Sequence, residues 1–569
     1  MIAANWGVRV RAAPVRLARI HANTGDASVT TSVTSLARMS AYASAAALTL
    51  ALAACGDDRT GEGPRTAVTA DQIEEGLDAL GFARSDLFAA ADVEIENGVA
   101  VYTGLTSTDE DAPGRVGRVS IGAPRVEDGV TRFDWLEAED LLAGGEDGEG
   151  VTRIARMRAD RPGPALSQAM SDLINGRMDA NDYQLPSRNA ADYTFAELSL
   201  SGLTFTGADA DGAAGGALAR VALEEFDGER LGRLVMEGLS ISGQDEDTGD
   251  FLLRLDEFAL TGLDALFIDV LLNLDDANEA GAGSGALAAR FADAMTGWMR
   301  PTGAFESWAM RGMDVRAGGA RIDMPTLDMR YETRRDDSVD IIAEMPRLTV
   351  ALSSDTPEMA QAAQMLASMG YETLDFELYS RSRYNPETDR MTVDLDNYWF
   401  EMKDGLRISM AQDVSGFQAY ADATAAVMSD MLAAMDDDPA AAEAALEERL
   451  LAAYGALQIH SMTVRIDDLD LLERAMRMNA QMQGVSPEEA RMQAATMLGL
   501  GIAMGGAMLP EGVALQMGTA LSAFINQGGA VEIAMTPAAP VPMDRLMNVA
   551  EDMSVLRDLG LTVRHIPAE

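Results

Sequence analysis

The sequence has few of the residues on which disulfides, metal sites and most catalytic sets depend. Its 569 residues include one cysteine, three histidines and a single lysine, Lys403. One cysteine excludes a disulfide within the chain and a cysteine-based zinc site. The histidines are His21, His460 and His565, and no Gly-x-Ser-x-Gly nucleophile motif accompanies them. We therefore expect no catalytic residues, no metal site and no cofactor.

Basic residues are also scarce relative to acidic ones. The chain holds 44 basic and 91 acidic residues, a formal net charge of -47. Residues 1–54 carry five of the arginines and one acid, which leaves 39 basic and 90 acidic residues, a net charge of -51, from Cys55 on. Such a surface repels nucleic acid, so no nucleic-acid partner is expected.

The lone cysteine stands at the end of an apolar run, in the stretch LTLALAACGDD. The run from Ala41 to Ala54 is 14 residues long. That length suits the apolar region of a signal peptide and is too short for a membrane-spanning helix, which needs about 20 residues. The motif Leu52-Ala53-Ala54-Cys55 resembles the lipobox of bacterial lipoproteins.

The lipobox resemblance implies cleavage between Ala54 and Cys55, followed by lipidation of the Cys55 thiol. Two or three acyl chains anchor a protein stably, whereas one binds only marginally. Gly56 follows the cysteine where an aspartate would, in some bacteria, retain the protein in the inner membrane. The resemblance therefore implies the periplasmic face of the outer membrane, with the inner membrane as the alternative. A buried core cysteine is disfavoured, because Gly56-Asp57-Asp58 would end a helix at once.

The apolar run begins about 40 residues into the chain, whereas signal peptides usually begin within the first few residues. A start at Val29, Val33 or Met39 would correct this distance. We interpret residues 1–54 as a signal peptide with an over-long start and residues 55–70 as the lipidated cysteine and a flexible tether. The tether is polar and contains glycine and proline.

Residues 71–190 predict a short helix followed by a β-rich region. Alternating apolar and polar residues recur over 92–107, 115–142 and 150–160. The dipeptides Asn97-Gly98 and Asp128-Gly129 predict tight hairpins, because both central residues of a type I′ turn need positive φ. The segment 144–150 is expected to be a loop.

Residues 191–415 contain a repeated sequence pattern, in which alternating apolar and polar residues are interrupted by glycine, as in AELSLSGLTFTG and RLVMEGLSISG. Each glycine predicts a bend or bulge within a strand, and a further bulge is expected near Asn397. The unequal spacing favours an antiparallel meander over a solenoid of identical units. In this pattern the chain resembles the repetitive β-rich envelope proteins of Gram-negative bacteria, such as the AsmA-like group.

Residues 416–569 predict a helix-rich region with a few strands. Helices are expected over 419–454, 470–483, 512–527 and 542–559, in addition to earlier ones over 286–299 and 357–369. Ser486 to Glu489 form a capping box at the start of another helix. That helix contains Gly501-x-x-x-Gly505, which we interpret as a buried helix in close backbone contact.

The predicted fold class is therefore α+β: an extended, mostly antiparallel β-meander with helical insertions and a helix-rich C-terminal third. The acidic clusters at 209–212, 245–250 and 467–470 invite a calcium interpretation, but none has the spacing of a calcium-binding loop. The 35 methionines are expected to fill an irregular core; the alternative is an apolar groove left where helices around 470–527 cover a sheet.

We expect a lipid-anchored periplasmic envelope protein with a binding or structural role and no catalysis. The membrane, through the anchor, is its expected partner, together with an envelope protein or a hydrophobic ligand. The alternative is a lipid-binding or transport protein with a methionine-rich apolar groove. An envelope hydrolase is the third hypothesis.

Overall fold

The computed structural model describes residues 64–81, 88–89, 92–107, 114–144, 151–175, 185–187, 189–209, 212–245, 249–265, 301–302, 305–353, 357–435, 449–505, 510, 512–548 and 554–568. All of them belong to one compact unit, Ala51–Glu569. The unit is built on one 21-stranded antiparallel sheet, with helices inserted between strands. The α+β meander predicted from the sequence is confirmed.

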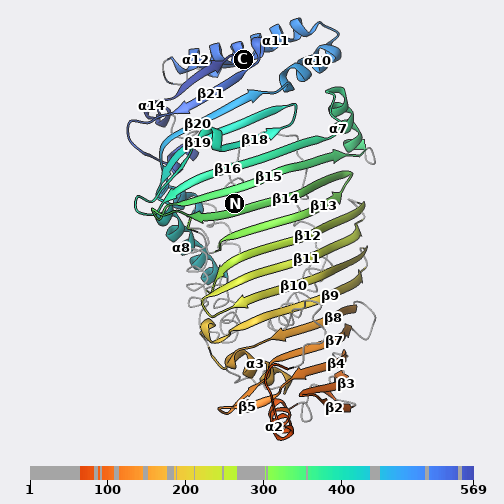
Figure 1. The fold of residues 1–569 in the computed structure, drawn as a ribbon. Coiled ribbons are helices and arrows are strands. Elements are labelled where there is room, and N and C mark those ends of the chain that lie inside the picture. The colour runs from red at the N-terminus through yellow and green to blue at the C-terminus, as the bar shows by residue number, and fades with distance from the viewer. Residues whose placement is uncertain are drawn as a thin grey trace. The chain divides into compact units, whose positions relative to one another are not determined.

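The sheet strands follow one another in nearly the same order in space as in the chain (Figure 1). They are β1 (Phe88–Ala89), β2 (Asp92–Glu96), β3 (Val99–Ser107), β4 (Gly114–Gly122), β7 (Trp135–Gly144), β8 (Val151–Asp160), β9 (Phe195–Asp209), β10 (Gly212–Phe226), β11 (Arg230–Asp245), β12 (Gly249–Asp264), β13 (Ser307–Ala317), β14 (Ala320–Thr333), β15 (Val339–Leu352), β16 (Leu374–Asn385), β17 (Arg390–Val393), β18 (Tyr398–Met402), β19 (Leu406–Ser415), β20 (Gln458–Asp468), β21 (Ala530–Met535), β22 (Val541–Pro542) and β23 (Thr562–Ile566). A separate hairpin pairs β5 (Arg125–Glu127) with β6 (Val130–Arg132).

The helices lie mainly at the two ends of the described chain. They are α2 (Ala70–Leu80), α3 (Pro164–Ile174), η4 (Ala190–Asp192), α7 (Pro357–Ser368), η5 (Leu395–Asn397), α8 (Phe417–Met435), α10 (Leu471–Gln483), α11 (Pro487–Gly505), α12 (Val513–Gln527), α13 (Met543–Met547) and α14 (Val555–Asp558). No helix among these described residues is long and apolar enough to cross a membrane.

Local sequence signals account for several of these boundaries. Asn97 and Asp128 have φ of 52°, and the glycine after each also has positive φ, as type I′ turns require. Both predicted hairpins are present, joining β2 to β3 and β5 to β6. In the predicted capping box, the Glu489 carboxylate accepts from the Ser486 backbone N–H and the Ser486 hydroxyl accepts from the Glu489 backbone N–H.

Other boundaries differ from the sequence prediction. The strand expected to bulge near Asn397 is instead divided by the 3₁₀ turn η5, so that β17 and β18 together pair with β16. In the described part of the helix predicted over 542–559, the chain forms two short helices, α13 and α14, after the strand β22. Two further predictions lie outside the described residues: the loop at 144–150, apart from residue 144, and the helix at 286–299.

The segment from Pro64 is attached to the N-terminal part of the sheet. The Asp134 carboxylate accepts hydrogen bonds from the Thr66 backbone N–H and hydroxyl, each at 2.7 Å, and from the Arg125 guanidinium at 3.0 Å. Burial alone would raise the pKa of Asp134, but these hydrogen bonds outweigh it and lower that pKa. The described end of the expected tether is therefore held in place.

Candidate functional site

Two rows of apolar residues cross the middle strands of the sheet, and we call them together the apolar face. One row joins cross-strand partners: Leu200, Val221, Met236, Phe258, Met310 and Leu327. The second row lies closer to the other end of the same strands: Leu203, Leu218, Leu239, Leu255, Met313 and Met324. With strands about 4.8 Å apart, six strands give each row a length of about 24 Å.

Between the two rows, one residue per strand interrupts the ladder. Ser201 pairs with Arg220 and Leu203 pairs with Leu218, but Gly202 and Ala219 between them are unpaired. Gly202 has a φ of 63°, in the left-handed region. Equivalent residues with positive φ recur on every second strand, and we call them the left-handed row: Gly104, Asp140, Gly202, Gly238 and Gly312. Gly202 and Gly238, for which the sequence predicted bulges, are thus part of one aligned feature, whereas Gly262 on β12 has a φ of 64° but lies outside the row.

The left-handed row coincides with a change in the phase of the sequence pattern. On β11 the apolar residues Leu234 and Met236 precede Gly238, and Leu239 follows it directly. An uninterrupted strand would turn Leu239 to the opposite side from Met236, because side chains alternate along a strand. A left-handed residue rotates the chain locally and compensates for this one-residue shift in the alternation. Both rows therefore belong to one face.

Burial at the N-terminal end of the sheet supports this account. Tyr102 and Leu105 lie on either side of Gly104 and are both buried, although they are three positions apart. On β8, Ile154 and Met157 lie on either side of Ala155, the position that faces Asp140 on β7 and Gly202 on β9, and they are also buried. In a regular strand, residues three apart point to opposite faces.

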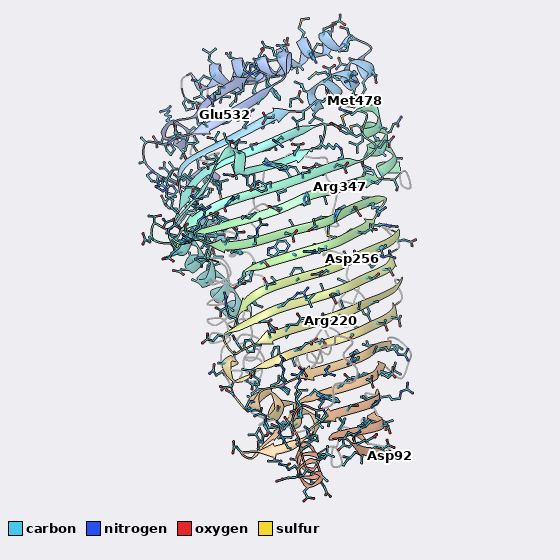
Figure 2. The ribbon with its side chains drawn as sticks, viewed as in Figure 1. Asp92, Arg220, Asp256, Arg347, Met478 and Glu532 are labelled. Carbon is cyan, nitrogen blue, oxygen red and sulfur yellow. The ribbon has the colours of Figure 1, made fainter. Side chains whose placement is uncertain are left out.

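The residues of opposite phase include charged side chains joined by ion pairs, which alternate with buried apolar residues such as Ala222 and Val235. Arg220 on β10 donates to Glu224 at 2.7 Å and to Glu197 on β9 at 3.0 Å, and Arg233 on β11 donates to Glu257 on β12 at 3.0 Å. These hydrogen bonds outweigh burial and raise the pKa of Arg220. One side of the middle strands thus carries both apolar rows, and the other carries the ion pairs of Arg220, which is labelled in Figure 2.

The apolar face is only partly covered. Four of its twelve residues are buried and the other eight keep partial exposure, including Leu239 and Met313. Among the described residues, no helix packs broadly against β10 to β13. At the C-terminal end, by contrast, α12 packs on β21 and β23, where Ala520 contacts buried Val531 and Val563.

Among the described residues, those singled out in the sequence are not brought together in one catalytic or metal site. Ala54 and Cys55 lie outside the described residues. The Ser415 hydroxyl is 2.9 Å from Nε2 of His460, but no described carboxylate bonds to His460. Nε2 of His565 bonds to the Gly528 carbonyl oxygen at 2.8 Å. No group of three metal-ligating side chains occurs within the described part of the chain.

The interpretation of α11 as a buried helix is wrong. Met492, Met497 and Leu500 are 63%, 69% and 56% exposed, and no atom lies within 4 Å of a Cβ placed on Gly501. The helix is apolar in composition, but it packs only against α10 and α12. Its outer side therefore remains in solvent, and Gly501 makes no close helix contact among the described residues.

Sequence reasoning missed a cluster of charges where β14, β15 and β16 meet. Asp340 on β15 is buried and pairs with Arg334, Arg381 and Arg383. The sequence signal for this cluster was the segment SRSRY, in which two arginines lie two positions apart on one strand. The partner carboxylate lies about 40 positions earlier, so only the strand register reveals the pairing.

A family match covers the C-terminal part of the chain. A family model described as "Uncharacterized protein" matches residues 399–566, from β18 to β23. No curated protein and no solved structure matches the chain. The matched family has no described activity to transfer, and the apolar face between β9 and β14 lies outside the matched residues.

Proposed function

We propose that this chain is a lipid-anchored periplasmic protein of the bacterial envelope that binds a lipid or another hydrophobic ligand on the apolar face. The observation that carries the proposal is the pair of apolar rows on β9 to β14, most of whose side chains keep partial exposure. Soluble monomers rarely expose contiguous apolar patches larger than a few hundred Å² unless the patch binds something.

The chemistry of the face favours a hydrocarbon ligand. Its twelve residues include no charged or hydrogen-bonding side chain, and eleven of them are aliphatic or methionine. Methionine side chains are flexible and adapt to irregular apolar partners. Burying apolar surface contributes about 25 cal/mol per Å². A hydrocarbon ligand that covers part of either row therefore gains several kcal/mol of binding free energy. The proposal assigns no catalytic activity.

The anchor is the second part of the proposal. The lipobox at Leu52 to Cys55 is its support, together with the position of Gly56, which favours the outer membrane. A membrane-attached protein meets its hydrophobic ligand where that ligand is concentrated. The anchor and the apolar face thus suit a role in binding or carrying envelope lipids.

Ligand binding can be tested with two substitutions of adjacent residues. The full chain is expressed in a Gram-negative host, purified, and extracted for mass spectrometry of bound lipids. We expect lipid to co-purify with the wild type and with Ser240→Asp, whose side chain belongs to the opposite phase, and to be lost from Leu239→Asp. Absence of lipid from the wild type, or equal lipid in both variants, contradicts the proposal.

Anchoring is tested independently by metabolic labelling with a fatty acid. The wild type should carry the label, and Cys55→Ala should lose both the label and signal processing. A labelled Cys55→Ala variant rules out the lipoprotein interpretation and leaves the binding proposal standing.

A further inference from the structure

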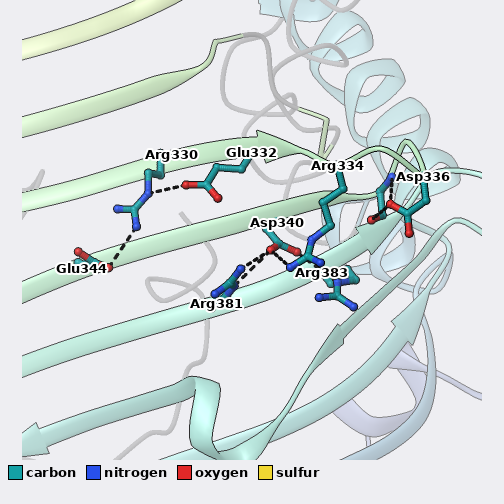
Figure 3. Close-up of polar contacts among 9 residues, drawn as sticks. Arg330, Glu332, Arg334, Asp336, Asp340, Glu344, Arg381 and Arg383 are labelled. Carbon is teal, nitrogen blue, oxygen red and sulfur yellow. Dashed lines mark hydrogen bonds and ion pairs between the residues drawn. The ribbon is translucent and has the colours of Figure 1, made fainter.

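Three guanidinium groups converge on one carboxylate at the ends of β14, β15 and β16 (Figure 3). The Asp340 side chain is 2% exposed. Its Oδ2 accepts from Arg334, and from Arg381 through Nη2 at 2.6 Å and Nε at 3.2 Å. Its Oδ1 accepts from Nε of Arg383 at 3.2 Å. The register explains the convergence, because Asp340 faces Arg383 directly across the strand pair.

The neighbouring carboxylates are held by other partners. Glu332 and Glu344 both accept from Arg330, at 3.0 and 3.4 Å. Asp336 accepts from the Ser338 hydroxyl at 2.7 Å. Asp340 is therefore the one carboxylate hydrogen-bonded to the three arginines in this part of the sheet.

One carboxylate uses few of the donors that three arginines offer. Each guanidinium carries five N–H donors, and a carboxylate neutralises a single positive charge. The arginine side chains remain 38%, 39% and 52% exposed, so their unused N–H groups are accessible to solvent. In two other described ion pairs the number of arginines per carboxylate is lower. Arg390 pairs one to one with Asp413, and Asp314 has two arginine partners.

We propose that Arg334, Arg381 and Arg383 form a binding site for a phosphoryl group, with Asp340 holding the three guanidinium groups in position. The planar fork of arginine matches two oxygens of a tetrahedral oxyanion, and such charge-assisted pairs are the strongest of the common hydrogen bonds. A phosphate would accept from the N–H donors that Asp340 leaves unused. The site is separate from the apolar face and does not depend on it.

The phosphoryl group could belong to free phosphate or to a lipid headgroup, which share this chemistry. The net charge of -51 from Cys55 on disfavours a wide anionic membrane surface, because repulsion acts over about 8 Å at physiological salt. A small anion that reaches the unused N–H donors of the three arginines is favoured on that ground.

The test measures thermal unfolding of the full chain in inorganic phosphate and in chloride at equal ionic strength. A ligand that binds only the native state raises the unfolding temperature in a saturable way. We expect such a rise for the wild type and about a tenfold weaker phosphate affinity for Arg383→Gln, which loses one charge-assisted fork. Asp340 keeps two arginine partners in that variant, so its carboxylate is not left unpaired. Arg383→Lys should be intermediate.

Arg390→Gln is the matched control. Arg390 lies on the adjacent strand β17, has similar exposure, and its removal leaves Asp413 without that partner. We expect it to lower the unfolding temperature and retain the phosphate effect. No saturable effect in the wild type, or an equal loss of affinity in Arg383→Gln and Arg390→Gln, overturns the proposal.

A second arm identifies the source of the phosphoryl group. Vesicles of phosphatidylglycerol and of phosphatidylcholine are tested for co-sedimentation with the same proteins. Phosphate-competed binding to phosphatidylglycerol that Arg383→Gln loses supports a lipid headgroup. A phosphate effect without vesicle binding supports a free phosphate.

Discussion

The middle and the C-terminal end of the sheet share a strand pattern but differ in what covers their apolar side. At the C-terminal end, α12 packs on Val531 and Val563, which are 3% and 6% exposed. In the middle, Leu239 and Met313 lie on strands against which no described helix packs broadly. Exposure therefore depends on the inserted helices and not on the strands, and the comparison predicts different consequences for the same substitution in the two regions.

The largest effect is expected where the apolar side is covered. Val531→Asp places a charge beneath α12 without a partner, and we expect a loss of about 4 kcal/mol in the free energy of unfolding. Leu239→Asp, on the partly exposed face, should cost less than half of that, because its carboxylate can reach water. Urea denaturation measures both. Equal losses would show that the two regions are covered alike.

Asp340→Asn should cost about 2 kcal/mol at neutral pH, because it leaves three arginines without their carboxylate. Burial acts to raise the pKa of Asp340, but the hydrogen bonds from the arginines outweigh it and hold that pKa well below its usual value of 3.8. A lowered pKa stabilises the native state above the ordinary value, and this stabilisation is lost as the pH falls below it. The difference from wild type should stay constant from about pH 7 to 5 and shrink below about pH 4. A difference that shrinks already near pH 6 would contradict the assignment.

Gly238→Ala tests the left-handed row that keeps the middle of the sheet apolar on one side. A Cβ at Gly238 would lie 2.7 Å from that of Ala219, and the φ of 64° is unfavourable for alanine. We expect a loss of about 1–2 kcal/mol together with weaker lipid binding. Gly215→Ala is the control, because a Cβ there meets no atom closer than 3.5 Å. A similar loss in both variants would mean that the row has no special role.

The smallest effect concerns the exposed helix α11. Ser486→Ala removes one half of the capping box and should cost about 1 kcal/mol. Because α11 packs only on α10 and α12, lipid binding in the middle of the sheet should not change. Hydrogen exchange of the first turn of α11 measures the local effect. Loss of bound lipid in this variant would connect the helices to the apolar face.

The sequence predicted features whose causes are local. The two type I′ hairpins, the capping box of α11 and the glycine interruptions in the strands follow from backbone conformations that single residues impose. The antiparallel meander followed from strand alternation with short turns. These features need no knowledge of which strands are neighbours.

Features that depend on register could not be predicted in the same way. The alignment of Gly202 with Ala219 and Gly238 requires the pairing of three strands, and the convergence on Asp340 joins residues more than 40 positions apart. The burial assigned to α11 failed because apolar composition does not tell whether another element covers a helix. The Cys55 anchor stays a prediction.

The left-handed row also limits how this sheet can change in length. Its residues fall on every second strand, so the repeating element is a pair of antiparallel strands. Duplication or deletion of one such pair preserves the alternation and the continuity of the apolar face, whereas gain or loss of one strand would break the alternation. Homologous chains with longer or shorter sheets should therefore differ by even numbers of strands. The length of the apolar face available to a ligand should then vary in steps of about 10 Å.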